Sequence, residues 1–63
     1  MMNEWYVIQH IETPDIFIKK DGGMTFMLTD AFMGPYGLTE LFYNVHLDKD
    51  VKKLFTIKKI KIV

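Results

Sequence analysis

Two histidines, His10 and His46, are the side chains in this sequence best suited to binding a metal ion. Together with Glu12 or Asp48 they offer the two nitrogens and one carboxylate of a common metal-binding set. Their spacing is not that of an HxxxH or HExxH motif, and the chain has no cysteine to add a thiolate ligand. We therefore predict no metal site and no cofactor, and we expect two partly exposed histidines, with His46 near the C-terminus of a helix.

The groups that commonly carry catalysis also lack a suitable setting. Asp48 and Asp50 are close in sequence, but they lie in a lysine-rich turn, which favours solvated carboxylates over general acid–base work. Serine and cysteine, the common nucleophiles, are absent from the chain. The glycines at 22–23 and 34–37 do not match the glycine-rich motifs that bind phosphate groups. The sequence therefore predicts a protein that is not an enzyme.

The chain has 63 residues, which is room for one domain over residues 1–63. Hydrophobic residues make up 49% of it, which is enough to fold, although so small a domain has a thin core. With no disulfide available, a second subunit is one way to add stability, so a homodimer stays open as an alternative. No targeting segment or membrane-spanning run is visible and cysteine is absent, so we expect a cytoplasmic protein with no membrane partner.

Charge is distributed unevenly along the chain, although its formal net value is zero. Residues 1–47 hold six acidic residues and two lysines, whereas residues 48–63 hold six lysines and two acidic residues. Lysine on a terminal strand guards a sheet edge against aggregation, and it also forms electrostatic rims of binding surfaces, here with the candidates Lys58, Lys59 and Lys61. Arginine, which reads phosphate and guanine through two hydrogen bonds, is absent, so nucleic acid ranks below protein as a partner.

Aromatic and β-branched residues predict three strands in the first half of the chain, at 5–11, 16–20 and 24–29. Residues 21–23, Asp-Gly-Gly, are a strong hairpin signal between the last two. A three-residue loop there would pair Ile18 with Phe26 and gather four large apolar side chains, whereas a two-residue loop would pair Phe17 with Phe26. We prefer the first register, and either one leaves apolar residues on both faces of the hairpin.

A short helix over residues 38–47 is predicted because four apolar residues follow the spacing of one helix face: Leu38, Leu41, Phe42 and Val45. A helix of this length depends on tertiary packing. Before it, residues 34–37 suit a β-turn with Pro35 in the second position. A competing interpretation makes Asp48 the N-cap of a second short helix.

Residues 54–63 form the last predicted strand, and its apolar pattern slips in phase. Phe55 and Ile57 fall on one face, whereas Ile60 and Ile62 fall on the other. A β-bulge at Lys58–Lys59 would restore one apolar face, and without it the strand is apolar on both faces in different halves. The element order predicts an α+β fold, a small antiparallel sheet of three or four strands with one short helix packed on one face.

The segment 31–37 and nearby Tyr43 are the most plausible place for a partner to bind. Loops usually lie on the surface, and this one presents two aromatic residues and a methionine between turn residues. Such residues are enriched in the centres of interfaces, so the predicted partner-binding residues are Phe32, Met33, Tyr36 and Tyr43. The alternative is that Phe32 and Met33 turn inward and complete the thin core.

Three segments of the first thirty residues resemble small uncharacterised proteins of phages and prophages in low-GC Gram-positive bacteria: Trp5–Ile8, Ile16–Gly22 and Leu28–Ala31. Those proteins typically contain a β-hairpin, a Thr-Asp pair, a charged helix and a final strand, in that order. Here the helix, Leu38–Val45, replaces a segment rich in glutamate and lysine. The resemblance implies an accessory protein that binds a host or phage protein, and it supplies no functional residues.

The sequence as a whole favours a small non-enzymatic protein-binding module, a phage or mobile-element accessory protein that binds or inhibits another protein. The first alternative is a binder of single-stranded or duplex nucleic acid that uses sheet aromatics and the C-terminal lysines. The second alternative is a self-associating structural subunit.

Overall fold

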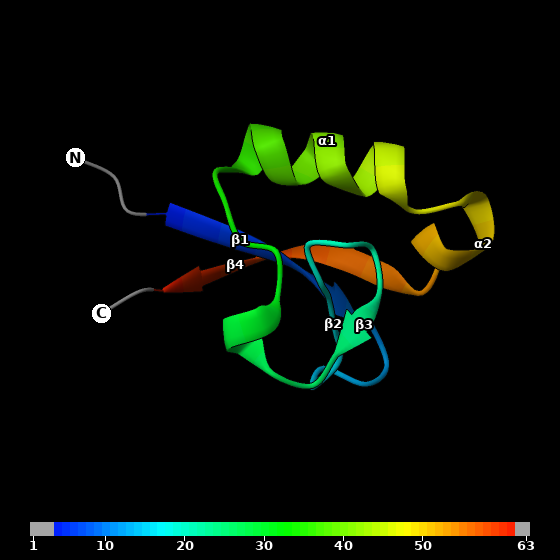
Figure 1. Cartoon of the computed structure of the whole chain (residues 1–63), viewed down its shortest axis with the longest axis horizontal. Coiled ribbons are helices and arrows are strands. Elements are labelled where there is room, and N and C mark those ends of the chain that lie inside the picture. The colour runs from blue at the N-terminus through cyan, green and yellow to red at the C-terminus, as the bar shows by residue number, and fades with distance from the viewer. Residues whose placement is uncertain (1–3, 62–63) are drawn as a thin grey trace.

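The computed structural model describes residues 4–61, and residues 1–3 and 62–63 lie outside the described part. In chain order the elements are β1 (Glu4–His10), β2 (Phe17–Ile18), β3 (Met24–Thr25), the 3-10 helix η1 (Leu28–Asp30), α1 (Tyr36–His46), α2 (Lys49–Lys52) and β4 (Phe55–Lys61). The strands form one antiparallel sheet in the order β3-β2-β1-β4. One main helix, α1, lies along one side of the long β1–β4 pair, which confirms the predicted α+β fold (Figure 1).

The two long strands pair without interruption, from Glu4 opposite Lys61 to His10 opposite Phe55. Of the two alternatives for β4, the β-bulge at residues 58–59 is therefore absent, and the strand is apolar on both faces in different halves, as the other alternative expected. Ile62, which belonged to the same prediction, lies outside the described residues. Ile57 lies against α1, whereas Ile60 lies opposite Trp5 on the other face. The bulge is unnecessary because both faces of the β1–β4 pair carry apolar partners.

The hairpin of β2 and β3 adopts neither of the two registers expected from the sequence. Phe17 pairs with Thr25 and Ile18 with Met24, so the loop is made of residues 20–22. The carboxylate of Asp21 accepts a hydrogen bond from the Gly23 N–H at 2.8 Å, and Gly22 has a φ of 92°. This local turn sets the register, because its side-chain bond competes with strand pairing.

The consequence is that Phe26 points to solvent with 73% of its surface exposed, and the expected apolar cluster does not form. Strand β3 also stops at Thr25, whose hydroxyl accepts a hydrogen bond from the Met27 N–H at 3.0 Å. The same Asp21–Gly23 hydrogen bond, with Lys19 nearby, lowers the pKa of the Asp21 carboxyl below its ordinary value.

The chain after η1 joins the sheet instead of forming a free loop. Ala31 forms a bridge with Lys19, and Gly34 exchanges two backbone hydrogen bonds with Tyr6 at 2.8 and 3.2 Å. Ala31 and Gly34 are buried, and Phe32 and Met33 are half-buried between them. This segment therefore partly completes the core, as the alternative interpretation expected for Phe32 and Met33.

Helix α1 begins two residues earlier than predicted, because Pro35 is its N-cap and accepts the first backbone hydrogen bond, from Thr39, at 3.0 Å. The predicted β-turn at residues 34–37 is replaced by this helix start. The second short helix is present as α2, and the Asp48 carboxylate caps it by accepting from the Val51 N–H at 2.9 Å. The competing interpretation of Asp48 is thus correct.

The core lies between α1, α2 and the sheet and is centred on Ile8, Ile18, Leu47 and Phe55. Thr39 and Tyr43 are on the side of α1 that faces this core. Tyr43 packs against the core cluster, and the Thr39 hydroxyl lies 3.0 Å from the Pro35 carbonyl and 3.2 Å from the Gly34 carbonyl. The face that the apolar spacing had marked is therefore mostly on the outside. This is the largest difference between the sequence-based expectation and the fold.

Two glycine replacements are expected to change stability in opposite directions. Gly22→Ala is expected to cost about 1–2 kcal/mol, because Gly22 has a positive φ that residues with a Cβ rarely adopt. Gly37→Ala is expected to gain up to about 1 kcal/mol, because Gly37 is helical and nothing lies within 4 Å of an added Cβ. Urea unfolding of both variants measures this, and equal shifts would contradict the described turn.

Candidate functional site

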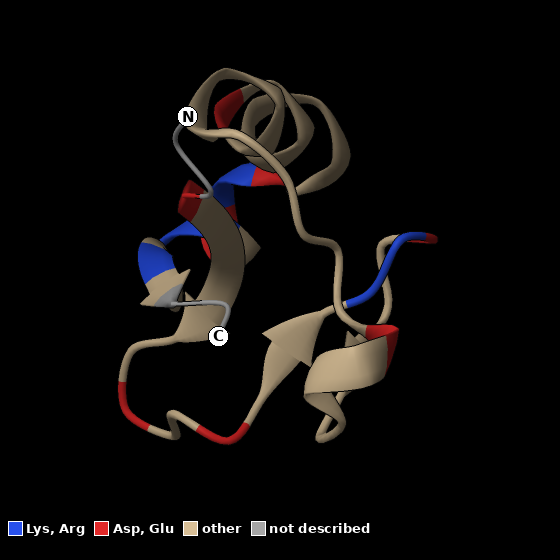
Figure 2. Ribbon diagram, turned by 90° about the vertical axis from the view of Figure 1, so that its left-hand side faces the viewer, with Lys and Arg blue, Asp and Glu red and all other residues tan. Residues whose placement is uncertain are grey.

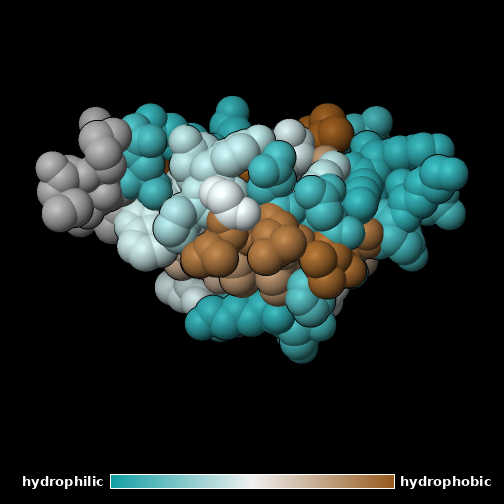
Figure 3. Space-filling model, turned by 90° about the horizontal axis from the view of Figure 1, so that it is seen from above, coloured by the Kyte–Doolittle hydropathy of each residue, from teal (hydrophilic) through white to brown (hydrophobic). Residues whose placement is uncertain are grey.

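The outward side of α1 carries an exposed apolar surface. Leu38, Leu41 and Val45 are 57%, 59% and 66% exposed, and their spacing of three and four residues places them in one row. Figure 3 shows a continuous hydrophobic patch on this side of the molecule. Of the Asp, Glu, Lys and Arg residue types, the helix carries only Glu40, seen as a single red segment in Figure 2.

Three stacked rings continue this row toward the sheet. The ring of Phe42 lies between those of Phe32 and His46, with both centroid distances at 4.2 Å and both interplanar angles at 19°. The three stacked rings and the row of aliphatic side chains together line a shallow groove of about 280 Å³. We call this surface the apolar α1 face, and it consists of Phe32, Leu38, Leu41, Phe42, Val45 and His46.

The four predicted partner-binding residues do not share one surface. Phe32 belongs to the apolar α1 face, whereas Met33 is half-buried and outside the groove. Tyr36 lies on another side of the helix, edge-on to Tyr6 at 5.2 Å between centroids. The Tyr43 hydroxyl donates to the Lys52 carbonyl at 2.8 Å and is 3.2 Å from the Phe55 carbonyl, a second acceptor, so this residue positions α1.

Sequence reasoning missed the exposure of Leu38, Leu41 and Val45. A signal was available in the spacing of Thr39 and Tyr43, two hydroxyl residues four apart that share a face of the helix. Together with the apolar row, they mark α1 as a helix with more than one side able to contact protein.

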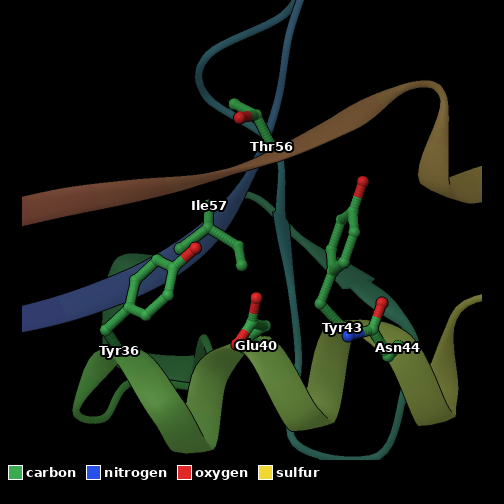
Figure 4. A pocket seen from close by; sticks show the side chains of 6 residues that line it. All are labelled: Tyr36, Glu40, Tyr43, Asn44, Thr56 and Ile57. Carbon is green, nitrogen blue, oxygen red and sulfur yellow. The ribbon is translucent and has the colours of Figure 1, made fainter.

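A second hollow lies on the opposite flank of α1, between the helix and β4. This cleft has a volume of about 290 Å³ and is lined by Tyr36, Glu40, Tyr43, Asn44, Thr56 and Ile57. Figure 4 shows the Glu40 carboxylate between the rings of Tyr36 and Tyr43, pointing toward β4. Its lining combines one carboxylate with two aromatic rings, unlike the groove of the apolar α1 face.

The lysines proposed as an electrostatic rim lie along β4. Lys58 and Lys59 are exposed, and Lys61 is the last residue of the strand. The Lys59 amine donates a hydrogen bond to the Glu4 carboxylate at 2.9 Å, and this contact raises the pKa of Lys59 above its ordinary value. Neither Lys58 nor Lys59 lines the groove on α1, so the rim and the apolar α1 face are separate surfaces.

The histidines occupy different settings. His10 Nδ1 accepts hydrogen bonds from the N–H groups of Glu12 and Thr13 at 3.2 and 3.0 Å, and its ring packs edge-on to Phe55. His46 stacks on Phe42. Within residues 4–61, no group of three or more His, Asp or Glu side chains is arranged to hold a metal ion.

Comparisons with known proteins assign this chain to no family. No protein-family model, no curated protein and no solved structure matches the chain. In the part of the chain that the structure describes, none of the helices has the length and apolar character needed to cross a membrane.

Proposed function

We propose that this chain is a non-enzymatic protein-binding module that docks the apolar α1 face into a groove of another protein. The observation that carries the proposal is the exposure of Leu38, Leu41 and Val45 in one row beside the stacked Phe32 and Phe42. Burying a large aliphatic side chain releases about 1.5–3 kcal/mol. A fold with a thin core that leaves three such side chains in water gains most from a partner that covers them.

The spacing of these residues fits a known way of binding. Amphipathic helices that bind in apolar grooves use anchors at i, i+3, i+4 and i+7, which here are Leu38, Leu41, Phe42 and Val45. Phe32 and His46 widen the surface beyond the helix itself. The rings of Phe32, Phe42 and His46 are already stacked in the unbound protein, so little side-chain entropy is lost on docking.

A different protein fits this surface better than a second copy of the chain. Helix α1 has 11 residues, so it is about 16 Å long, and two such convex helices touch along a narrow line. A stable interface buries about 800 Å² on each partner. A concave groove on a different protein could contact Phe32 as well as the row of Leu38, Leu41 and Val45 on α1. The resemblance to small phage and prophage proteins supports a host or phage protein as the partner.

The proposal is tested by introducing a negative charge into the apolar row and comparing it with the same charge at an exposed leucine outside the groove. In affinity capture from bacterial lysate, Leu41→Asp is expected to lose the proteins that the parent chain retains, and titration of the recovered partner is expected to show at least about 30-fold weaker binding. Leu54→Asp is the control, because Leu54 is 49% exposed and lies outside the groove. Both variants are checked for folding by circular dichroism.

Two results would refute the proposal. Equal retention of partners by Leu41→Asp and Leu54→Asp would show that the apolar α1 face is not the contact surface. Sedimentation of the parent chain as a dimer that Leu41→Asp converts to a monomer would assign the surface to self-association instead.

A further inference from the structure

We propose that the free edge of β4 and the α1–β4 cleft form a second binding site, which accepts an extended segment of a partner protein as an added strand with an arginine in the cleft. This site is independent of the apolar α1 face. The proposal rests on three features: unpaired backbone groups on β4, a cleft beside them, and the charge inside that cleft.

Strand β4 is an edge of the sheet and pairs on one side only, with β1. Its hydrogen-bonding direction follows from one contact, the Ile11 N–H donating to the Leu54 carbonyl at 2.9 Å. Residues in antiparallel strands alternate between bonding to the partner strand and facing away from it. By that alternation the backbone groups of Ile57 and Lys59 face outward.

The other side of the ladder agrees with this assignment. Tyr6 lies opposite Lys59, and both backbone groups of Tyr6 bond to Gly34, away from β4. The outward carbonyl of Phe55 is already within reach of the Tyr43 hydroxyl at 3.2 Å. Among residues 4–61, nothing pairs with the outward groups of Ile57 and Lys59, so these can accept an added strand.

The cleft lies directly beside this edge. Ile57 points toward α1 and lines the cleft together with Glu40 (Figure 4). Residues that lie opposite each other in a ladder have their side chains on the same face. The residue of an added strand opposite Ile57 would therefore direct its side chain into the cleft, which has room for a long one at about 290 Å³.

The charge in the cleft selects a cation. Glu40 has no ion pair among the described residues, and it stands between the rings of Tyr36 and Tyr43. A carboxylate flanked by aromatic rings suits a guanidinium group, which forms two hydrogen bonds with a carboxylate and stacks on ring faces. The Lys52 amine lies 6.0 Å from the Tyr43 centroid, at the outer limit of a cation–π contact.

A second copy of this chain is a poor occupant of the site. The sequence contains no arginine. An antiparallel pair of two β4 strands centred on Lys58 or Lys59 would also bring these lysines close to their own counterparts, and like charges across a ladder are destabilising. The arginine-bearing strand must therefore come from another protein.

The test uses a blocked seven-residue peptide of alternating threonine and valine with arginine at its centre, titrated into the full chain and followed by amide NMR. We expect shifts at Glu40, Ile57 and Lys59, and slower hydrogen exchange of the Ile57 and Lys59 amides. Replacing the peptide arginine by glutamine is expected to weaken binding about tenfold, as is Glu40→Gln in the protein. Glu12→Gln is the matched control, because Glu12 is exposed and far along the chain from the cleft.

Backbone pairing is tested separately with a peptide N-methylated at alternate amides, which is expected not to bind. No binding of the parent peptide at millimolar concentration, equal binding of the arginine and glutamine peptides, or unchanged binding of the N-methylated peptide would each overturn the proposal. Leu41→Asp is expected to leave peptide binding unchanged, so failure of this site and failure of the apolar α1 face are distinguishable.

Discussion

Ile8→Ala is expected to lower the free energy of unfolding by about 2–5 kcal/mol, enough to unfold a large fraction of the chain. Ile8 is fully buried at the centre of the core cluster with Ile18, Leu47 and Phe55. Its truncation leaves a cavity that a small domain fills only in part. A 63-residue domain has a total stability of about 3–9 kcal/mol, so one such loss removes about half of it or more. Urea unfolding followed by circular dichroism measures the change.

The matched control is Leu41→Ala, which removes an aliphatic side chain from α1. Leu41 is 59% exposed, so its truncation is expected to change the free energy of unfolding by less than about 0.5 kcal/mol. A cost for Leu41→Ala as large as that for Ile8→Ala would mean that α1 packs with its apolar row inward. The pair of variants therefore tests the orientation on which the apolar α1 face depends.

Tyr43→Ala is expected to cost about 3 kcal/mol, because the residue contributes both packing and hydrogen bonds that hold α1 in place. Its ring packs against the core cluster, and its hydroxyl lies within hydrogen-bond distance of the Lys52 and Phe55 carbonyls. These two carbonyls belong to the end of α2 and the start of β4. Tyr43 thus connects three elements, and its loss is expected to loosen all of them.

Tyr43→Phe separates the two contributions. The ring stays and only the hydroxyl is lost, so the expected cost is about 1 kcal/mol. Hydrogen exchange of the α2 amides is expected to quicken in both variants, since α2 has only four residues and depends on this contact. A Tyr43→Phe variant as stable as the parent chain would contradict the role assigned to the hydroxyl.

Helix α1 presents different residues to three surroundings: the sheet, the solvent and the cleft beside β4. Thr39 and Tyr43 face the sheet, the row of Leu38, Leu41 and Val45 faces solvent, and the flank with Glu40 faces the cleft beside β4. The two proposed sites therefore lie on different sides of one short helix. Because the contacts of Thr39 and Tyr43 fix its rotation, they fix what both sites present to a partner.

The sequence by itself determined the α+β fold, the long first and last strands, the place of the main helix, and Asp48 as a cap. These follow from patterns between neighbours, such as alternation, helical spacing and side-chain capping. It placed Phe32 in the candidate surface but missed Leu38, Leu41 and Val45.

Only the tertiary structure decided the hairpin register and the rotation of α1. Both sides of the hairpin and more than one side of the helix are apolar, so hydrophobic pattern alone cannot choose between them. The choice is made by polar contacts, some local, as at Asp21, and some distant. Tyr43 bonds to carbonyls nine and twelve residues away, and Thr39 lies 3.5 Å from the Tyr6 carbonyl, 33 residues away. Partners so far apart in the chain are known only once the fold has brought them together.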